Sequence, residues 1–333
     1  MRFGLALPHY GFSLPGDEPI THEALLGWAR RAEALGFDSV WVSDHFLYSF
    51  ARFGAGDERI GSLEPLTALA AVAVATERVR VGTLVLGSPF RHPSTLATIA
   101  AGIDQLSGGR LELGVGAGWF EDEFRSFGFP FGSAGERFER LEETLQVLGA
   151  LFAGGSVSLD GHSVSLREAE LLPPPVQRPI PVWVGGKGGP RVLRLAARYA
   201  AGWNVVWRMS PEVYAQRVEP ARRICEEEDR DPSTFRLSVG LYGLIGRDEG
   251  AARAAFARGR ADMPGGALDS ETYETWCTDT LSGSPDRILE RVAAFEALGV
   301  EELILSPWVL PFAVREPEQV DLFARHVIEP LRG

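Results

Sequence analysis

Apolar positions along the chain alternate between two spacings, one typical of buried strands and one typical of amphipathic helices. The segment RFGLALP (2–8) is a continuous apolar run, as expected of a strand buried on both faces. The next segment, THEALLGWARRAEALG (21–36), has apolar residues every three or four positions, which predicts a helix. Thr21 is suited to the N-cap of this helix and Gly36 to its end.

The same pair of patterns recurs along the chain and predicts eight strands separated by helices. The strands are expected at 2–8, 39–45, 78–87, 110–118, 182–186, 202–206, 235–246 and 301–307. The helices are expected at 21–36, 65–76, 93–107, 136–154, 189–200, 211–228, 251–261, 284–299 and 316–331. Strands that alternate with helices pair in parallel with right-handed crossovers. The predicted fold is therefore an α/β barrel of the (β/α)8 type, with loop insertions.

Two segments interrupt the repeat. The polar stretch SVSLDGHSVSL (156–166) has Asp160 and Gly161 as a turn pair and predicts a hairpin. The stretch 262–283 has no clear periodicity and is expected to be irregular. We expect this stretch and the insert at 156–175 to shape the substrate entrance. No change in composition divides the chain, so a single domain over 1–333 is predicted.

Composition narrows the classes of function. The chain has 333 residues and a formal net charge of -12, which argues against a nucleic-acid partner. Cys225 and Cys277 lie far apart, so neither a disulfide framework nor a zinc site is expected, and no metal is predicted. The N-terminus does not resemble a signal peptide, and the longest apolar run, 66–75, is too short to cross a membrane. A cytoplasmic protein with no membrane partner is expected.

Barrel active sites lie at the carboxyl ends of the strands, which selects candidate residues by position alone. The second strand ends in Asp44 and His45. A histidine exchanges protons near neutral pH, and adjacent strand residues point to opposite sides. One member of the pair is therefore expected to face the barrel mouth while the other braces a neighbouring loop. A purely structural pair is the alternative.

Glycine-rich backbone follows the fourth and fifth strands. GVGAGW (114–119) departs from a dinucleotide fingerprint, and it predicts either a strand end packed closely on a neighbour or a backbone on which a cofactor lies. GGKGGPR (185–191) contains Lys187, the only lysine of the chain, and opens a predicted helix at Pro190. Backbone N–H groups at a helix N-terminus attract anions, so this loop predicts an anion site; a simple turn is the alternative.

Four segments resemble one known family, the bacterial-luciferase-like superfamily, and in particular its branch that uses the deazaflavin coenzyme F420. They are GFDSVWVSDHF (36–46), VRVGTLVLGSPFRHP (79–93), LSGGRLELGVGAGWFEDEF (106–124) and PVWVGGKGGPRVLRLAARYAAGW (181–203). The resemblance implies a (β/α)8 barrel with the deazaflavin bound in its mouth. It also implies a homodimer.

The resemblance implies roles for particular residues. Asp44 would approach the deazaflavin ring and His45 would take part in proton transfer. A non-prolyl cis peptide between Leu84 and Val85 would back the ring. Independently of the resemblance, the glycine-rich end of the fourth strand makes Gly116, Ala117 and Gly118 candidates for contact with the cofactor. Its phosphate would lie on Gly188 and Gly189, with Gly186 and Lys187 beside them.

The chain departs from the sugar-phosphate dehydrogenases of this family. Trp119 and Asp122 stand where those enzymes have a glutamate and an asparagine, and Lys187 is the only lysine available for a substrate phosphate. These departures favour an apolar or conjugated substrate over a sugar phosphate. The predicted substrate pocket comprises Trp119, Asp122, Trp207 and Trp308, although each tryptophan could instead pack structurally.

Three functions follow from the resemblance. The leading one is an F420-dependent oxidoreductase that transfers a hydride between the deazaflavin C5 and a small organic substrate. The alternative on the same barrel is a luciferase-like monooxygenase that uses reduced FMN and oxygen. The third is a non-catalytic flavin-binding relative, against which the presence of Asp44 and His45 argues.

Overall fold

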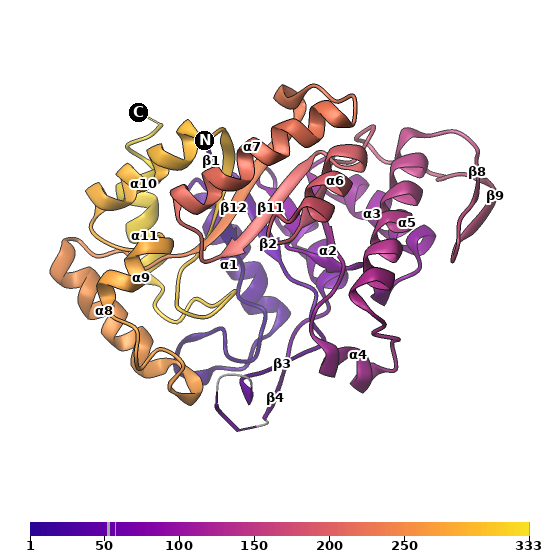
Figure 1. Cartoon of the computed structure of the whole chain (residues 1–333). Helices are drawn as coiled ribbons and strands as arrows, with labels where there is room; N and C mark the ends of the chain where they lie inside the picture. Colours follow the sequence, from indigo (N-terminus) through magenta and orange to yellow (C-terminus); the bar gives the residue numbers. More distant parts are fainter. Residues whose placement is uncertain (52–53, 57, 333) are drawn as a thin grey trace.

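The eight predicted strands pair in parallel into one closed barrel, which confirms the predicted fold class (Figure 1). The computed structural model describes residues 1–51, 54–56 and 58–332. Neighbours in the barrel follow the order β10, β11, β12, β13, β1, β2, β5 and β7, and β7 pairs with β10 to close it. The eight strands are β1 (Arg2–Ala6), β2 (Ser39–Val42), β5 (Arg80–Thr83), β7 (Leu111–Gly116), β10 (Val182–Gly185), β11 (Gly202–Trp207), β12 (Arg236–Tyr242) and β13 (Val300–Ser306).

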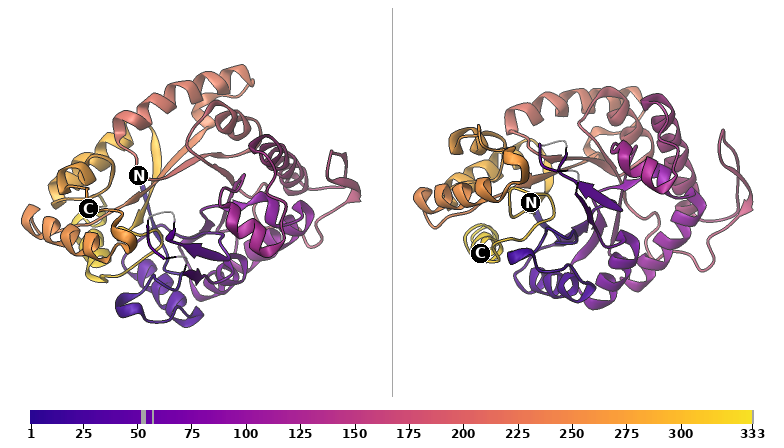
Figure 2. Two further views of the ribbon diagram at one scale, coloured as in Figure 1. Left: turned by 60° about the horizontal axis from the view of Figure 1, so that its bottom comes forward. Right: turned by 90° about the horizontal axis from the view of Figure 1, so that it is seen from below.

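The helices surround the barrel, as the views in Figure 2 show. Most begin at a proline or at a side-chain cap; Thr21, for example, accepts a hydrogen bond from the backbone of Ala24, as its predicted role as N-cap requires. The helices are α1 (His22–Ala34), α2 (Pro65–Ala75), α3 (Pro93–Leu106), α4 (Glu121–Phe127), α5 (Ala134–Ala153), α6 (Pro190–Tyr199), α7 (Pro211–Glu227), α8 (Glu249–Asp262), α9 (Tyr273–Asp279), α10 (Pro285–Ala297) and α11 (Glu318–Phe323), continued by a π-helical turn (Ala324–Ile328). Short 3₁₀ turns occupy Pro15–Asp17, Ser88–Phe90, Pro232–Thr234 and Pro264–Gly266.

The third predicted strand is wrong in one respect, because it is not continuous. The chain leaves β5 after Thr83, and a separate strand β6 (Leu86–Gly87) pairs with β7. The peptide between Leu84 and Val85 is cis, as the family resemblance implied. A second non-prolyl cis peptide, between Val206 and Trp207, was not predicted.

The two insertions lie in different parts of the molecule. Strands β8 (Val157–Asp160) and β9 (Ser165–Ala169) form the predicted hairpin, which projects away from the barrel (Figure 2). The stretch 262–283 contains the short helix α9 and is not wholly irregular. A further hairpin, β3 (Leu47–Ser49) with β4 (Arg59–Gly61), follows the second barrel strand and was missed.

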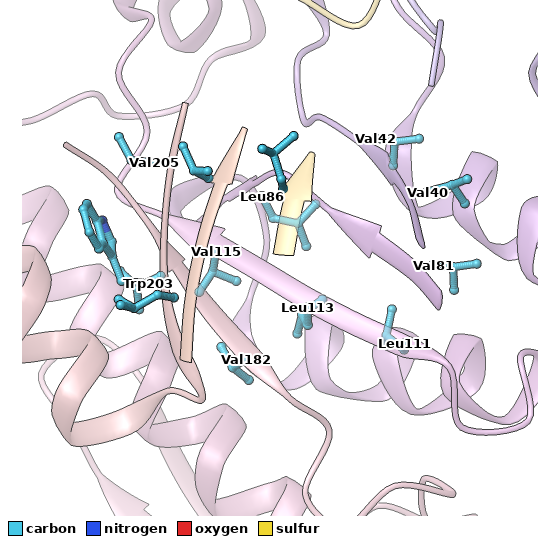
Figure 3. Packing of buried hydrophobic residues seen from close by; sticks show 14 of the residues in the cluster. Val40, Val42, Val81, Leu86, Leu111, Leu113, Val115, Val182, Trp203 and Val205 are labelled. Atoms are coloured by element: carbon cyan, nitrogen blue, oxygen red, sulfur yellow. The ribbon is translucent and has the colours of Figure 1, made fainter. Parts of the chain in front are cut away.

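The apolar core between strands and helices is formed by every second strand residue. Val40 and Val42 belong to this core (Figure 3). Trp41 between them points to the other side, into the barrel interior, where it packs against Gly4 and Gly82 of the neighbouring strands. The ring of Trp41 fills this interior so tightly that a Cβ added at Gly82 would lie 2.5 Å from it. Glycine is therefore required at position 82 by the packing of the indole.

Charged side chains fill the amino-terminal end of the barrel. Glu112 and Glu302 are both buried, and Arg2 contacts both, at 3.5 and 3.0 Å. Arg80 and Arg236 lie 2.6 and 3.4 Å from Glu112. Burial raises the pKa of Glu302 despite the neighbouring arginines. This paired cluster forms a closed floor, opposite to the end where a barrel carries its active site.

No helix in the described ranges is both long and apolar enough to cross a membrane.

Candidate active site

A pocket of about 730 Å³ lies at the carboxyl ends of the barrel strands, where the fold places catalytic residues. The volume lies in the range of small-molecule and cofactor sites. Most of the predicted site residues line it: Asp44, His45, Leu84, Val85, Gly116, Ala117, Gly118, Trp119, Gly186, Lys187, Gly189 and Trp207. Other lining residues include Tyr10, Ser43, Tyr48, Phe120, Glu123, Arg137, Asn204, Tyr242 and Phe312.

His45 faces this pocket with a fixed orientation. Its Nδ1 lies 3.0 Å from the Oε2 of Glu123, and a carboxylate can only accept in such a bond. The ring therefore carries its hydrogen on Nδ1, and Nε2 is left for a ligand. The rings of Trp119 and Tyr10 lie 5.7 and 6.3 Å from the imidazole, so the histidine stands among aromatic faces.

Glu123 is the functional residue that sequence reasoning missed. It is 1% exposed, and its Oε1 accepts hydrogen bonds from the backbone N–H groups of Phe46 and Leu47. The signal was present, because Phe120, Glu123 and Phe124 have helical spacing and place a carboxylate on an apolar face. Helix α4 was not predicted, so the spacing was overlooked.

Asp44 braces a loop instead of facing a proton-transfer partner. Its carboxylate is held by both terminal nitrogens of Arg91, at 2.6 and 3.0 Å, and accepts from the N–H of Gly87 at 2.9 Å. Burial tends to lower the pKa of Arg91, but the carboxylates of Asp44 and Glu64 outweigh it and raise that pKa. With both oxygens engaged, the geometry lends no support to the predicted chemical role of Asp44, which stays a prediction.

A buried chain of hydrogen bonds reaches the pocket from the first strand. The Nδ1 of His9 lies 3.0 Å from the carbonyl oxygen of Leu7, so this nitrogen carries the hydrogen. Its Nε2 then accepts from the Ser43 hydroxyl at 2.9 Å, and Ser43 accepts from the Tyr10 hydroxyl at 2.5 Å. Burial lowers the pKa of His9 to about 4, which keeps it neutral at neutral pH. Tyr10 therefore offers lone pairs, not its hydrogen, to a ligand.

Glycines at the ends of the fourth and fifth strands allow a close approach at the pocket wall. A Cβ at Gly116 would lie 2.9 Å from the Val85 side chain, and one at Gly185 would lie 2.7 Å from it. Gly118 has a φ of 76°, and a Cβ there would lie 2.6 Å from the Phe124 ring. The predicted close packing of this backbone is thus present, and the same segment lines the pocket.

The glycine-lysine loop forms the other end of the pocket. Gly186, Lys187 and Gly189 line it, whereas Gly188 is not in the lining and has a φ of 73°. Gly189 is the N-cap of α6 and provides no side chain to its free N–H groups. These N–H groups, together with Lys187, are suited to an anion.

Two predicted substrate residues lie outside the pocket. Trp308 is 2% exposed, and its indole N–H donates to Asp262 at 2.9 Å, so it packs structurally. Asp122 points to solvent from α4, 3.7 Å from Arg125, because the next residue, Glu123, takes the inward face of the helix. Trp119 and Trp207 do line the pocket.

No described residue of 156–175 or 262–283 lines the pocket, although Trp276 of the second stretch stacks on the lining residue Tyr242 at 5.7 Å; their role at the substrate entrance stays a prediction. The hairpin tip lies instead against α5, where Glu143 accepts from the N–H groups of Ser163 and Val164 at 2.8 and 3.1 Å. The described residues contain no group of three or more metal-ligating side chains.

The described residues fit a flat cofactor that ends in a phosphate. The wall at Leu84 and Gly116 can receive a ring, the loop at Lys187 can receive an anion, and His45 stands between aromatic side chains. The sequence profile of a family described as luciferase-like monooxygenase matches residues 1–302.

The chain belongs to the luciferase-like monooxygenase family. This membership makes it an oxidoreductase and confirms the resemblance noted from its sequence motifs.

The relatives of this chain include proteins described as dependent on F420 and one described as dependent on FMNH(2). The chain is 36% identical over 198 residues to an F420-dependent glucose-6-phosphate dehydrogenase of Microbacterium testaceum, covering 59% of this chain and 56% of that relative. A protein of Beutenbergia cavernae with the same description is 36% identical over 302 residues, covering 84% and 86%. An FMNH(2)-dependent dimethylsulfone monooxygenase of Pseudomonas putida is 29% identical over 331 residues, covering 91% and 86%.

A solved structure shares the fold. It is an F420-dependent secondary alcohol dehydrogenase in complex with an F420–acetone adduct, with a TM-score of 0.77, 20% identity and coverage of 98% of both chains. At this identity the likeness supports the barrel architecture alone.

Proposed function

We propose that this protein is an F420-dependent oxidoreductase that acts on a small, uncharged organic substrate. The observation that carries the proposal is His45, fixed by Glu123 and facing a pocket whose far end is suited to a phosphate. The two relatives described as F420-dependent glucose-6-phosphate dehydrogenases support this choice of cofactor.

Different residues of the pocket would bind the cofactor and orient the substrate. Gly186, Lys187 and Gly189 would hold the cofactor phosphate, and Leu84 and Gly116 would support its ring. When bound, F420 supplies the hydride-transfer chemistry at its C5 carbon. Aromatic side chains at the mouth orient the substrate and exclude water.

His45 holds or moves the proton. Its hydrogen on Nδ1 is committed to Glu123, so Nε2 acts as the base towards a substrate hydroxyl, or as the acid when protonated. Tyr10 would accept a hydrogen bond from the substrate, because its own hydrogen is donated to Ser43. Asp44 keeps the loop after β6 in place through Arg91 and Gly87.

The nature of the substrate follows from the lining of the pocket. Among the described residues that line it, the only arginine and lysine side chains are Arg137 on α5 and Lys187 in the anion loop. Trp119, Trp207 and Tyr242 line the remainder. This favours an apolar or conjugated substrate over a sugar phosphate.

An FMN-dependent monooxygenase is the second candidate. The Pseudomonas putida relative, which favours it, matches a larger share of this chain than the F420-dependent relatives named above. Titration of the purified protein with F420 and with FMN, followed by cofactor fluorescence, separates the two. We expect micromolar or tighter binding of F420; binding of FMN without binding of F420 would replace the proposal by the monooxygenase.

Substitution of His45 tests the mechanism. We expect His45→Asn to bind F420 like the wild type but to lose about 10²- to 10⁴-fold in kcat, the usual contribution of a positioned acid or base. Single-turnover absorbance of the deazaflavin measures the loss. Unchanged turnover in this variant would remove His45 from the mechanism.

A further inference from the structure

Four cationic side chains surround the beginning of α6, and the function described so far uses only one of them. They are Arg137 on α5, Lys187 in the loop, Arg191 on α6 and Arg217 on α7, and we call them the cationic rim. Within the described parts of the chain, none of the four lies within 4.0 Å of a carboxylate oxygen. The rim stands out because the chain as a whole has a net charge of -12.

Contacts bring these side chains to one place. A guanidinium nitrogen of Arg191 donates to the carbonyl of Gly135 at 3.2 Å, which ties the start of α6 to the first turn of α5. Arg137 lies on that same turn and lines the pocket. On the other side, a Cβ at Gly188 would lie 3.3 Å from the Cγ of Arg217, so that arginine packs along the loop.

Other arginines on the same helices form ion pairs with glutamates. On α6, Arg194 pairs with Glu227 at 2.8 Å, and Arg198 pairs with Glu228. On α7, Arg222 lies 4.0 Å from Glu219. Several arginines further along these helices are therefore paired with carboxylates, whereas the four side chains of the cationic rim are not paired with any described residue.

Arg137 also has an unmet hydrogen-bonding group. Its Nη1 donates to the carbonyl of Gly132 at 2.8 Å, and its guanidinium lies 3.9 Å from the centre of the Phe131 ring. Its buried Nε has no partner among the described residues. A buried donor without a partner costs free energy, which a ligand carboxylate could recover.

One phosphate does not account for four such cations. Lys187 and the free N–H groups of α6 are already sufficient for it. An overall acidic protein repels a polyanion, so a local group of unpaired cations is needed to hold one. FMN ends at its phosphate, whereas F420 continues beyond its phosphate as a chain of glutamates.

We propose that the cationic rim binds a polyanionic extension of the cofactor beyond its phosphate, which in F420 is the oligoglutamate tail. The proposal rests on the proposed function and adds a second contact region outside the pocket. It assigns Arg191 and Arg217, which do not line the pocket, to cofactor affinity.

The test compares F420 with its glutamate tail and the same cofactor without glutamates. Both are titrated by deazaflavin fluorescence at low ionic strength against the wild type and the double variant Arg191→Gln/Arg217→Gln. Exposed ion pairs contribute about two- to fivefold each, so we expect the wild type to prefer the tailed form by about tenfold. The double variant should lose most of that preference and bind the tail-less form normally.

The matched control is Arg222→Gln/Arg223→Gln, which removes the same charge from α7 about 8 Å further along its axis. It should keep the preference, and thermal melting should show that all variants are folded. Equal binding of both F420 forms by the wild type would overturn the tail site and leave the proposed function intact. An unchanged preference in the double variant would also overturn it. Failure of both F420 forms to bind, with FMN bound, would overturn the proposed function itself.

Discussion

His9 and His45 lie on neighbouring strand ends but belong to different environments. His45 is held by a carboxylate and faces the pocket, whereas His9 is fully buried and held by Leu7 and Ser43. Burial of His9 penalises its charged form and lowers its pKa to about 4. The two histidines therefore have different roles: His45 faces the pocket as the candidate acid or base, whereas His9 is a buried acceptor in a hydrogen-bond chain.

Acid should destabilise the protein through His9. The pKa of the group is lowered in the folded state, so its contribution to stability is complete above its unfolded value of 6.5 and is lost as the pH falls towards 4. The loss amounts to about 3 kcal/mol. Urea unfolding at a series of pH values between 7.5 and 4 measures it.

The variant His9→Gln isolates this effect, because it cannot take up a proton. We expect a lower stability at pH 7.5 and a shallower decline towards pH 4 than in the wild type. An equally steep decline in the variant would assign the acid sensitivity to other groups.

Position in the fold predicted some site residues and not others. The barrel rule selected His45 and the glycine loop, because strand ends can be read from apolar runs. Glu123 was missed because its helix begins in a segment that was not assigned. Arg137 gave no signal at all, since an arginine in the first turn of a helix is usually solvated and only the tertiary structure brings it to the pocket.

Alanine substitutions in the loop before α6 distinguish glycines that are needed for the backbone conformation from glycines that contact the cofactor. Gly188 has a φ of 73°, and a Cβ there would lie 2.7 Å from the Trp203 ring. We expect Gly188→Ala to lower the free energy of unfolding by about 1–3 kcal/mol and to weaken F420 binding. Thermal melting and fluorescence titration measure the two effects.

Gly189 provides the matched control for this substitution. Its φ is -69°, and a Cβ there would meet no atom within 4 Å. Gly189→Ala should therefore keep the stability of the wild type, so that any change in F420 affinity reports contact with the phosphate. A loss of stability equal to that of Gly188→Ala would show that the structural argument is wrong.

Helices and strands were more predictable than the segments between them. All eight barrel strands and the nine expected helices appear near their predicted positions, because apolar periodicity reflects burial directly. The break between β5 and β6 could not be read from periodicity, since a cis peptide leaves the apolar run VRVGTLVLG unchanged. Its position came from the family resemblance alone.

The helices α2 and α3 present an uncharged surface on an otherwise acidic molecule. Their 11 and 14 residues include a single charged side chain, Asp104, which is buried. Val74, Ile99 and Leu106 are 67%, 36% and 54% exposed on these helices. An uncharged surface is complementary to itself, so two copies could meet there in a two-fold arrangement despite their equal net charge.

We therefore expect a homodimer in solution that uses this surface. The double variant Val74→Lys/Ile99→Lys should be monomeric in light scattering coupled to size exclusion, because it places like charges opposite each other. Val213→Lys, at an exposed valine on α7, is the control and should remain dimeric. A wild-type mass near 36.2 kDa would contradict the expectation.

The charged floor of the barrel has a consequence for how the family could diversify. Glu112 and Glu302, with their arginines, close one end of the strands, and Trp207 and Tyr242 line the pocket at the other. Because the described side chains that bind Glu112 and Glu302 do not line the pocket, selection could change the pocket residues without first compensating a loss of stability at the floor. New substrate ranges would then be reached by few substitutions, all of them at the mouth.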